Sequence, residues 1–150
     1  MVLDKQLEEF DYSDSQGATS CIVLVTESKI YCANAGDSRA ILVREKAGAI
    51  ALSKDHKPNV SQELTRIEAA GHSVCMERVD GNLALSRALG DYSFKQNEEK
   101  KPEEQAVTAF PDLKEVDRSP SDKMIVVACD GIWDCVTNEE CADKLNKSLK

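Results

Sequence analysis

The sequence lacks most of the features that mark membrane, secreted, zinc-binding or nucleotide-binding proteins. No apolar run approaches the roughly 18 residues that span a bilayer, and the acidic N-terminal residues lack the basic start and apolar stretch of a secretory signal. The chain has only 2 histidines and no Cys-x-x-Cys pair, which argues against zinc. It has no Gly-x-Gly-x-x-Gly or Walker loop for a nucleotide. We therefore expect no membrane association and an intracellular location, cytoplasmic or nuclear.

Length and charge narrow the class further. With 150 residues, of which 41% are hydrophobic and 31% charged, the chain has the composition of a soluble globular protein, so we expect residues 1–150 to form a single domain. The net charge of −8 argues against nucleic acid as a partner. It is compatible with divalent cations, although a diffuse acidic surface can equally be a solvated one.

The 6 cysteines lie inside or beside apolar segments. Without a secretory signal, such residues are expected to be buried free thiols and not disulfides. They are Cys21, Cys32, Cys75, Cys129, Cys135 and Cys141.

The chain is organised around the stretch KMIVVACDGIWD, residues 123–134. Its continuous apolar run predicts a strand buried on both faces. The strand ends at Asp130, where Asp-Gly is typical of a turn because Gly131 tolerates positive φ. A carboxylate at the end of a rigid core strand suits a metal ligand. Alternatively, Asp130 is only a turn residue and Trp133 only fills the core.

A helix is predicted directly after this stretch. Thr137 and Glu140 have the spacing of a capping box, and Val136 is placed to pack against Cys141. Apolar residues then recur on one helical face, at positions 141, 145 and 149.

The rest of the chain alternates between strand and helix patterns. We expect an amphipathic helix over residues 2–11 and a meander of four strands over residues 20–27, 30–36, 40–45 and 49–53. A helix of about three turns is expected over residues 59–71, where it stops at Gly71, followed by a short strand over 72–78, a tight turn over 80–82 and a segment of ambiguous type over 83–89. Residues 92–106 are expected to form a charged surface loop and residues 112–118 an edge strand.

A second carboxylate, Asp37, lies between two apolar strands beside Gly36, which allows a sharp reversal. Two carboxylates at strand ends could converge, and oxygen donors of this kind suit Mg²⁺ or Mn²⁺. The alternative is a hairpin turn in which Asp37 pairs with Arg39.

Two further residues could take part in chemistry. His56 could act as an acid or base near neutral pH, although a single histidine before a proline is more often structural. Arg87 could bind phosphate, but a helical ion pair with Asp91 would give the same pattern. Spacing alone therefore predicts an acidic α+β domain that could bind metal, and it does not give the reaction.

Seven blocks of the sequence, from about residue 17 to residue 140, resemble the PP2C (PPM) family of metal-dependent protein serine/threonine phosphatases, in the order and at the spacing of that family. The blocks are GATSCIVLV, YCANAGDSRAIL, LSKDHKP, ELTRIEAAG, RVDGNLALSRALGD, VTAFPDL and IVVACDGIWD.

The resemblance implies an α+β fold, a partial αββα sandwich of antiparallel β-sheets flanked by helices. It implies hydrolysis of phosphoserine or phosphothreonine in protein substrates, assisted by Mn²⁺ or Mg²⁺. Asp130 matches a ligand of one of the two catalytic ions, and Asp37 and Asp134 match acids that hold a third ion with it. The segment from Asn59 to Asn82 matches a flap beside the active site, a source of substrate preference. The blocks around His56 and Arg87 match structural motifs.

The chain also departs from the family pattern. It lacks the N-terminal segment with a phosphate-binding Arg, the Asp-Gly-His-Gly-Gly motif and the late Asp-Asn dipeptide, and His72 replaces a usual glycine. We therefore identify no catalytic residue here and expect a truncated domain that is inactive alone, with catalysis in a longer parent. The alternative is a non-catalytic, pseudophosphatase-like binding module. A sandwich without its first strands is expected to self-associate.

Overall fold

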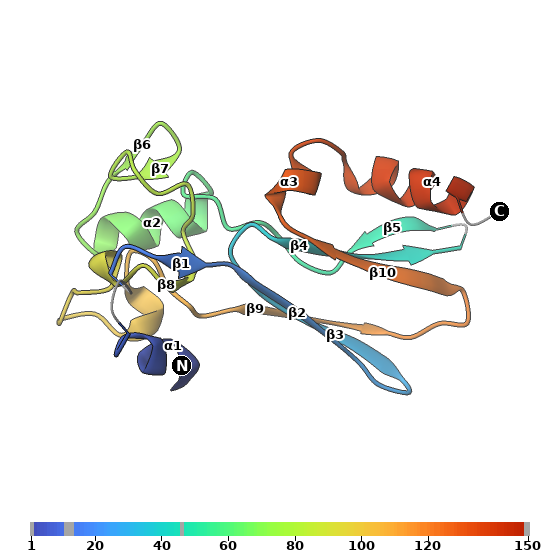
Figure 1. The fold of residues 1–150 in the computed structure, drawn as a ribbon, viewed down its shortest axis with the longest axis horizontal. Coiled ribbons are helices and arrows are strands. Elements are labelled where there is room, and N and C mark those ends of the chain that lie inside the picture. The colour runs from blue at the N-terminus through green and yellow to red at the C-terminus, as the bar shows by residue number, and fades with distance from the viewer. Residues whose placement is uncertain (1, 11–13, 46, 149–150) are drawn as a thin grey trace. The chain divides into compact units, whose positions relative to one another are not determined.

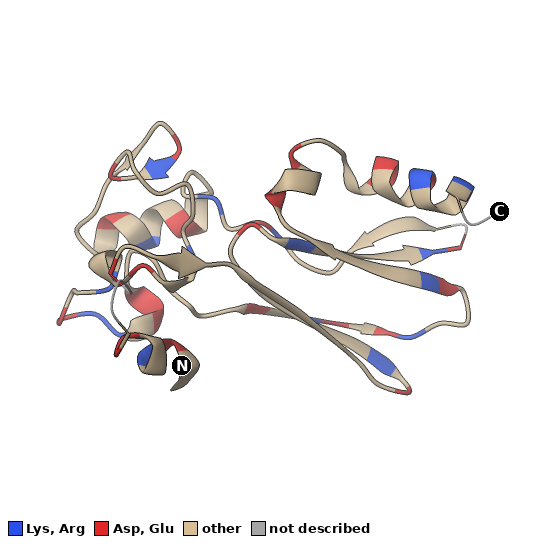
Figure 2. Ribbon diagram, viewed as in Figure 1, with Lys and Arg blue, Asp and Glu red and all other residues tan. Residues whose placement is uncertain are grey.

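The computed structural model describes residues 2–10, 14–45 and 47–148, which form two compact units. The first unit comprises residues 1–20, 35–37 and 55–111, and the second comprises residues 21–34, 38–54 and 112–150. Acidic and basic residues are interspersed along both units (Figure 2). Of the helices in the described part of the chain, none has the length and apolarity to cross a membrane.

The second unit contains two three-stranded sheets and two helices (Figure 1). One sheet has the order β2-β3-β9 and the other the order β10-β4-β5, and the ladders β3–β9, β10–β4 and β4–β5 are antiparallel. The elements are β2 (Ser20–Val25), β3 (Lys29–Ala35), β4 (Arg39–Arg44), β5 (Gly48–Ala51), β9 (Asp112–Asp117), β10 (Asp122–Ala128), α3 (Asp130–Trp133) and α4 (Asn138–Ser148).

The two sheets pack face to face through alternate residues of their strands. Ile30 and Cys32 of β3 contact Ala40 and Leu42 of β4 in a buried apolar cluster that also contains Leu52. Successive side chains of a strand point to opposite faces, so these residues define the inner face of each sheet. Each fully buried Ile or Leu contributes roughly 1.5–3 kcal/mol to folding.

The outer face of the β10-β4-β5 sheet is covered by helices. Ile41 and Val43 of β4 pack against Trp133, Cys141 and Ala142 of α3 and α4. The unit therefore has three layers, helix on sheet on sheet, which confirms the predicted sandwich of antiparallel sheets flanked by helices.

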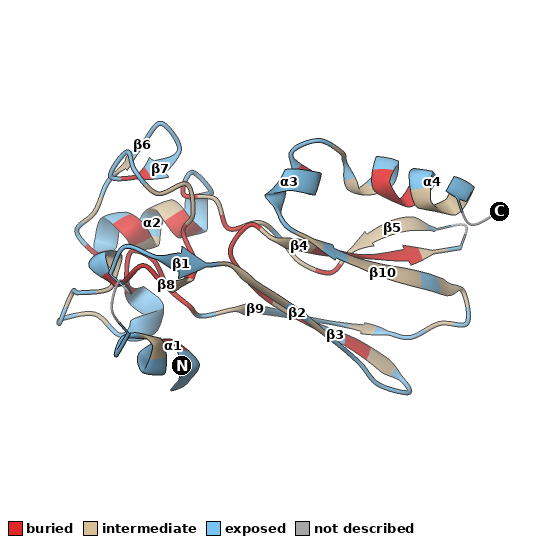
Figure 3. Ribbon diagram, viewed as in Figure 1, coloured by how far each residue is buried: buried red, intermediate tan, exposed pale blue. Residues whose placement is uncertain are grey.

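The outer face of the β2-β3-β9 sheet is exposed (Figure 3). Ile22 and Leu24 of β2 are 62% and 60% exposed, and Leu113 of β9 is 79% exposed. These side chains and Tyr31 line a surface hollow of about 440 Å³. A sheet of this unit therefore packs on one face and presents an apolar surface on the other.

Two predictions about the strands are wrong. The four consecutive strands do not form one meander, because β3 and β4 lie in different sheets and the chain changes sheet at residues 36–38. β10 contacts apolar clusters on both faces but is an edge strand, and its Val127 is 48% exposed. A short apolar run shows that both faces pack, and it does not show whether the strand has neighbours on both sides.

The first unit is built around α2, and Ile67 of this helix packs with Val79, Ala88 and Val107. Gly71 has φ +94° and ends the helix as predicted. The elements are α1 (Val2–Leu7), β1 (Gly17–Ala18), α2 (Ser61–Ala69), β6 (Val74–Cys75), β7 (Arg78–Val79), β8 (Leu89–Gly90), η1 (Tyr92–Phe94) and η2 (Pro102–Glu104).

Several predicted elements of this unit differ from the structure. The first helix ends at Leu7, and the predicted strand over 72–78 is the hairpin β6–β7 with a turn at residues 76–77. The charged segment 92–106 contains two 3-10 turns, and its Tyr92 and Gln105 are buried. Arg66 donates to the Gln105 carbonyl at 2.9 Å, so tertiary hydrogen bonds order a segment that has little apolar content of its own.

A buried carboxylate, Glu63 of α2, joins α2 to the segment after it. Its side chain is 2% exposed and accepts hydrogen bonds from Arg87 Nη2 at 2.6 Å, Arg66 Nη1 at 2.7 Å and Ser86 Oγ at 2.7 Å. Burial favours the neutral acid, but the hydrogen bond from Arg87 and the charge of Arg66 prevail and lower the pKa of Glu63 to about 2. Arg87 therefore pairs with Glu63. It forms neither of the two predicted arrangements, a phosphate site or a helical pair with Asp91.

We expect Glu63→Gln to lower the free energy of unfolding by about 3 kcal/mol at pH 7, because it leaves Arg66 and Arg87 buried without their counter-charge. The pKa of Glu63 is lower when folded, so its stabilisation is present above the unfolded pKa of 4.5 and is lost as the pH falls toward 2. Urea unfolding at pH 7 and at acidic pH measures both effects. Glu68→Gln, on the exposed face of the same helix, is the control, and equal stability of the two variants would contradict the prediction.

Candidate functional site

Asp130 and Asp134 lie at the two ends of the short helix α3, directly after β10. Asp130 is its first residue and Asp134 its C-cap, and the Asp134 N–H donates to the Asp130 carbonyl at 2.8 Å. Residues four apart on a helical turn share a face, and both residues are exposed. The predicted Asp-Gly turn is wrong, because Gly131 lies within the helix and is not among the residues with positive φ.

Trp133 fixes α3 against the ends of β10 and β4. Its ring is buried, and its Nε1–H donates to the carbonyls of Ala128 at 2.8 Å and Arg39 at 3.2 Å. The Arg39 guanidinium lies 5.2 Å from the ring centroid, within the range of a cation–π contact. The side chain therefore packs in the core, as one alternative predicted, and it also holds the turn that carries the two carboxylates.

The helix after this turn begins with the predicted capping box. The Thr137 N–H donates to Glu140 Oε2 at 2.8 Å, and the Glu140 N–H donates to Thr137 Oγ1 at 3.2 Å. Val136 and Cys141 pack in the same apolar cluster with Leu145. Leu149, predicted on the same face, lies outside the described residues. The capping box and the apolar face hold α4 on the sheet and so fix the end of the segment that follows Asp134.

Asp37 lies in the connection between β3 and β4 and belongs to the first unit. It is buried, and its carboxylate is in contact with the Lys57 ammonium. Gly36 beside it has φ +118°, and a Cβ there would overlap the Thr19 side chain, so only glycine fits. Arg39 does not pair with Asp37 as one alternative predicted, since its Nη1 donates to Asn138 Oδ1 at 2.8 Å.

The structure brings Asp130 and Asp134 together on one turn, while Asp37 belongs to the other unit. The convergence of all three stays a prediction. Within residues 2–10, 14–45 and 47–148, no group of three or more His, Cys, Asp or Glu side chains is arranged to hold a metal ion.

Both histidines have structural roles. His56 is buried, and its Nδ1 lies 3.1 Å from the Gly36 N–H, which confirms the structural interpretation of this residue. His72 Nδ1 lies 2.7 Å from Asp80 Oδ2. His72 does not have positive φ, so the replacement of the usual glycine does not strain the backbone at this position.

Sequence reasoning missed Lys57 and Glu63. The block around His56 was noted for its histidine, whereas the structure shows that Lys57 is the residue beside Asp37. Glu63 occupies a predicted helix and has no local sequence signal of burial, because its partners Ser86 and Arg87 are more than 20 residues away.

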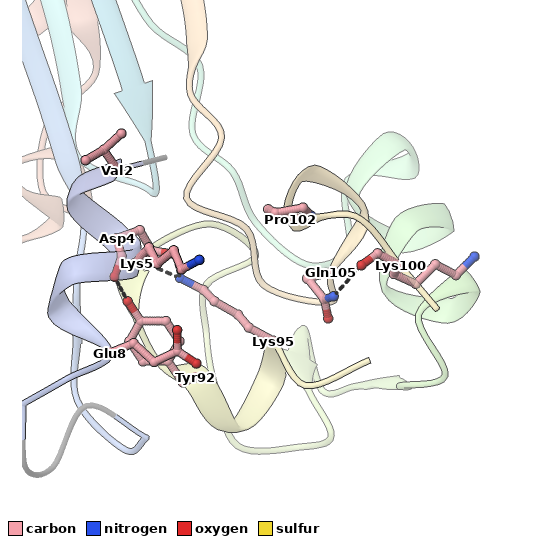
Figure 4. Close-up of a pocket in the computed structure, with 9 residues that line it drawn as sticks. All are labelled: Val2, Asp4, Lys5, Glu8, Tyr92, Lys95, Lys100, Pro102 and Gln105. Carbon is pink, nitrogen blue, oxygen red and sulfur yellow. Dashed lines mark hydrogen bonds and ion pairs between the residues drawn. The ribbon is translucent and has the colours of Figure 1, made fainter. Parts of the chain in front are cut away.

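A cavity of about 470 Å³ in the first unit lies between α1 and the segment that ends at Gln105 (Figure 4). Lys95, the residue that follows η1, points into it. Its Nζ donates to Asp4 Oδ1 at 3.0 Å, Asp4 Oδ2 at 3.1 Å and the Ala88 carbonyl at 2.8 Å. Burial lowers the pKa of Lys95, although Asp4 opposes the shift. Since these contacts use the three donors of its ammonium, Lys95 attaches α1 and does not offer its charge to a ligand.

Comparison with known proteins decides the family. The model of the protein phosphatase 2C family matches residues 2–150. This chain belongs to the protein phosphatase 2C family. It is 48% identical over 143 residues to protein phosphatase 2C homolog 2 of Saccharomyces cerevisiae, covering 91% of this chain and 30% of that protein. It is 46% identical over 148 residues to protein phosphatase 2C homolog 3 of Schizosaccharomyces pombe, covering 97% of this chain and 35% of that protein.

Solved structures agree with the family assignment. A crystal structure of a phosphatase from Toxoplasma gondii is 49% identical, with a TM-score of 0.67 over 70% of this chain and 32% of that one. A serine-threonine phosphatase 2C of Toxoplasma gondii, 23% identical with a TM-score of 0.74 over 93% of this chain and 48% of that one, shows the same fold. The chain thus spans well under half the length of the curated relatives named above.

Proposed function

We propose that this chain is part of a protein serine/threonine phosphatase of the 2C type, which hydrolyses phosphoserine and phosphothreonine in protein substrates. The observation that carries the proposal is the match of the phosphatase 2C family over residues 2–150. We further propose that the two units are parts of one truncated domain, since a single family model spans both. In the parent protein the activity depends on residues beyond these 150, because the chain has no Asp-Gly-His-Gly-Gly motif.

We propose that Asp37, Asp130 and Asp134 hold Mg²⁺ or Mn²⁺. Carboxylate oxygens are the donors that these hard cations prefer. Asp37 already accommodates a cation, the Lys57 ammonium, and Asp130 and Asp134 are exposed on one face of α3. Asp130 and Asp134 thus offer two exposed carboxylates of the kind that a hydrated divalent ion takes as ligands. A bound ion supplies neutralisation of phosphate charge and activation of water.

The register of the central sheet supports this assignment. The β10–β4 ladder ends with the pair Ala128 and Arg39. Asp130 follows Ala128 by two residues, and Asp37 precedes Arg39 by two. In an antiparallel pair both of these segments leave the ladder at the same end. Trp133 then holds α3 in place through its bonds to the carbonyl of Ala128, the last residue of β10, and the carbonyl of Arg39, the first residue of β4.

The metal assignment predicts that Mn²⁺ quenches the fluorescence of Trp133, the only tryptophan, because this ring lies on the turn between Asp130 and Asp134. We expect saturable quenching with a midpoint on the order of 1 mM, typical of a weak oxygen site. Asp130→Asn is expected to raise the midpoint at least about tenfold. Asp143→Asn, an exposed carboxylate on α4, is the control. Identical titrations of the wild type and Asp130→Asn would contradict the assignment.

We expect the 150-residue chain to hydrolyse phosphothreonine peptides very slowly or not at all. An oxygen site for two cations needs several carboxylates and waters, and of the core ligands that the resemblance implies only Asp130 is present. Without the phosphate-binding Arg of the family, both positioning and charge stabilisation of the phosphate are lost. The measurement is phosphate release with Mn²⁺ present, for the wild type and Asp130→Asn. Turnover that disappears in the variant would show that a complete site forms here.

We also propose that the chain self-associates through the exposed face of the β2-β3-β9 sheet. Ile22 and Leu24 of β2 and Leu113 of β9, the two strands that flank β3, give this face a set of exposed apolar side chains. A two-fold axis parallel to the face, in the plane of the interface, would place the apolar rows of two copies against each other, since an isologous contact uses the same patch twice. A second copy is thus a partner of matching shape and polarity.

The self-association proposal predicts a mass that depends on concentration in sedimentation equilibrium. The value should rise from 16.5 kDa toward twice that mass at concentrations on the order of tens of micromolar. The double variant Leu24→Lys, Leu113→Lys is expected to remain monomeric, because it places charges in the apolar row. Val60→Lys, which changes an exposed apolar residue of the first unit, should behave as the wild type. A monomeric wild type would refute the proposal.

A further inference from the structure

Asp37 and Lys57 form an ion pair in which only the carboxylate is buried. The Asp37 side chain is 7% exposed, the Lys57 side chain is 37% exposed, and the ammonium contacts Asp37 Oδ2. A buried carboxylate is costly unless a positive charge lies beside it. Asp37 therefore has a counter-charge already, from a lysine whose side chain reaches the surface.

The backbone on both sides of Lys57 is held in place. The His56 N–H donates to the Gly36 carbonyl at 3.1 Å, and the His56 carbonyl accepts a hydrogen bond from the Ser86 hydroxyl at 2.9 Å. Pro58, on the other side of the lysine, is fully buried. The flexible four-carbon side chain of Lys57 is thus the part of this contact that can change position.

A cavity of about 290 Å³ borders the Lys57 side chain within the first unit. Its lining is mainly polar or charged and includes Asn59, Glu77 and Arg78. Asn59 Nδ2 donates to Glu77 Oε1 at 2.8 Å, which fixes that carboxylate at the cavity wall. The Lys57 ammonium can therefore leave Asp37 for solvated, polar surroundings that include a second carboxylate.

Given the metal site and the phosphatase function proposed above, we propose that Lys57 competes with the divalent ion for Asp37, so that its ammonium must leave the carboxylate before an ion binds there. An ammonium and a divalent cation repel each other at one carboxylate, and burial weakens the screening of that repulsion. Lys57 therefore neutralises Asp37 when the site is empty, and it lowers the affinity of Asp37 for Mg²⁺.

Lys57→Met tests the competition, because methionine removes the charge and keeps much of the apolar stem. We expect this variant to bind Mg²⁺ about tenfold more tightly than the wild type. Without Mg²⁺ its thermal midpoint should fall by roughly 10 °C, since Asp37 is then buried without its counter-charge. Saturating Mg²⁺ should reverse part of that loss. Lys54→Met, which removes one positive charge at an exposed position, is the control and should behave as the wild type.

The experiment follows Lys57 directly by NMR in the full 150-residue chain labelled with ¹³C and ¹⁵N. Mg²⁺ is added to concentrations on the order of 10 mM, with the ionic strength held constant by NaCl. The Lys57 Cε methylene signal, identified by its absence from Lys57→Met, should move saturably toward the position of the exposed Lys54. The amide signals of Gly36 and Asp37 give the affinity in each variant. In Asp37→Asn the Lys57 signal should stay in place.

Three outcomes would overturn the competition. Amide shifts at Gly36 and Asp37 with a stationary Lys57 signal would do so, and so would equal or weaker Mg²⁺ binding by Lys57→Met; both leave the metal assignment and the phosphatase function standing. Amide shifts at Asp130 with none at Asp37, in the wild type and in Lys57→Met, would also remove Asp37 from the metal site. No shift at either aspartate in any variant would overturn the competition and the metal assignment together.

Discussion

The structure depends on the packing of β4 on both of its faces. Ala40 and Leu42 face the other sheet, while Ile41 and Val43 face α3 and α4, and all four side chains are buried. A strand packed on two faces cannot shift by one residue, because every side chain would then point into the wrong layer. The register with β10 is therefore fixed, and so is the position of the α3 turn that follows Ala128.

The two units are stabilised in different ways. The second unit has two apolar clusters, one on each side of the β10-β4-β5 sheet. The first unit has a smaller apolar cluster around Ile67 and a polar centre in which Glu63 binds Arg66, Ser86 and Arg87. A buried ion pair costs desolvation and adds little stability compared with apolar packing, but loss of one partner is severe. The segment from residue 83 to residue 91 has little regular structure of its own, and this polar centre fixes its path.

The functional proposals concern residues whose buried charge or solvent exposure is not explained by packing. Asp37 is a buried carboxylate in contact with the ammonium of a half-exposed lysine, Lys57. Ile22, Leu24 and Leu113 expose an apolar face that a soluble protein usually covers. Both features occur in a chain that spans well under half the length of its named relatives.

Local sequence pattern determined the elements that depend on nearby residues. The strands of the second unit, the stop at Gly71 and the capping box of Thr137 and Glu140 follow from alternation, positive φ and side-chain geometry within a few residues. Seven sequence blocks also predicted the family, which the comparison confirmed.

Tertiary structure decided what depends on distant residues. The sequence could not show that β3 and β4 belong to different sheets, because strand partners lie far apart in the chain. It could not show that Lys57 contacts Asp37 or that Glu63 is buried among two arginines. A charged side chain has the same local pattern on a solvated face and in a buried ion pair, and only its partners, set by the packing of the whole unit, distinguish the two.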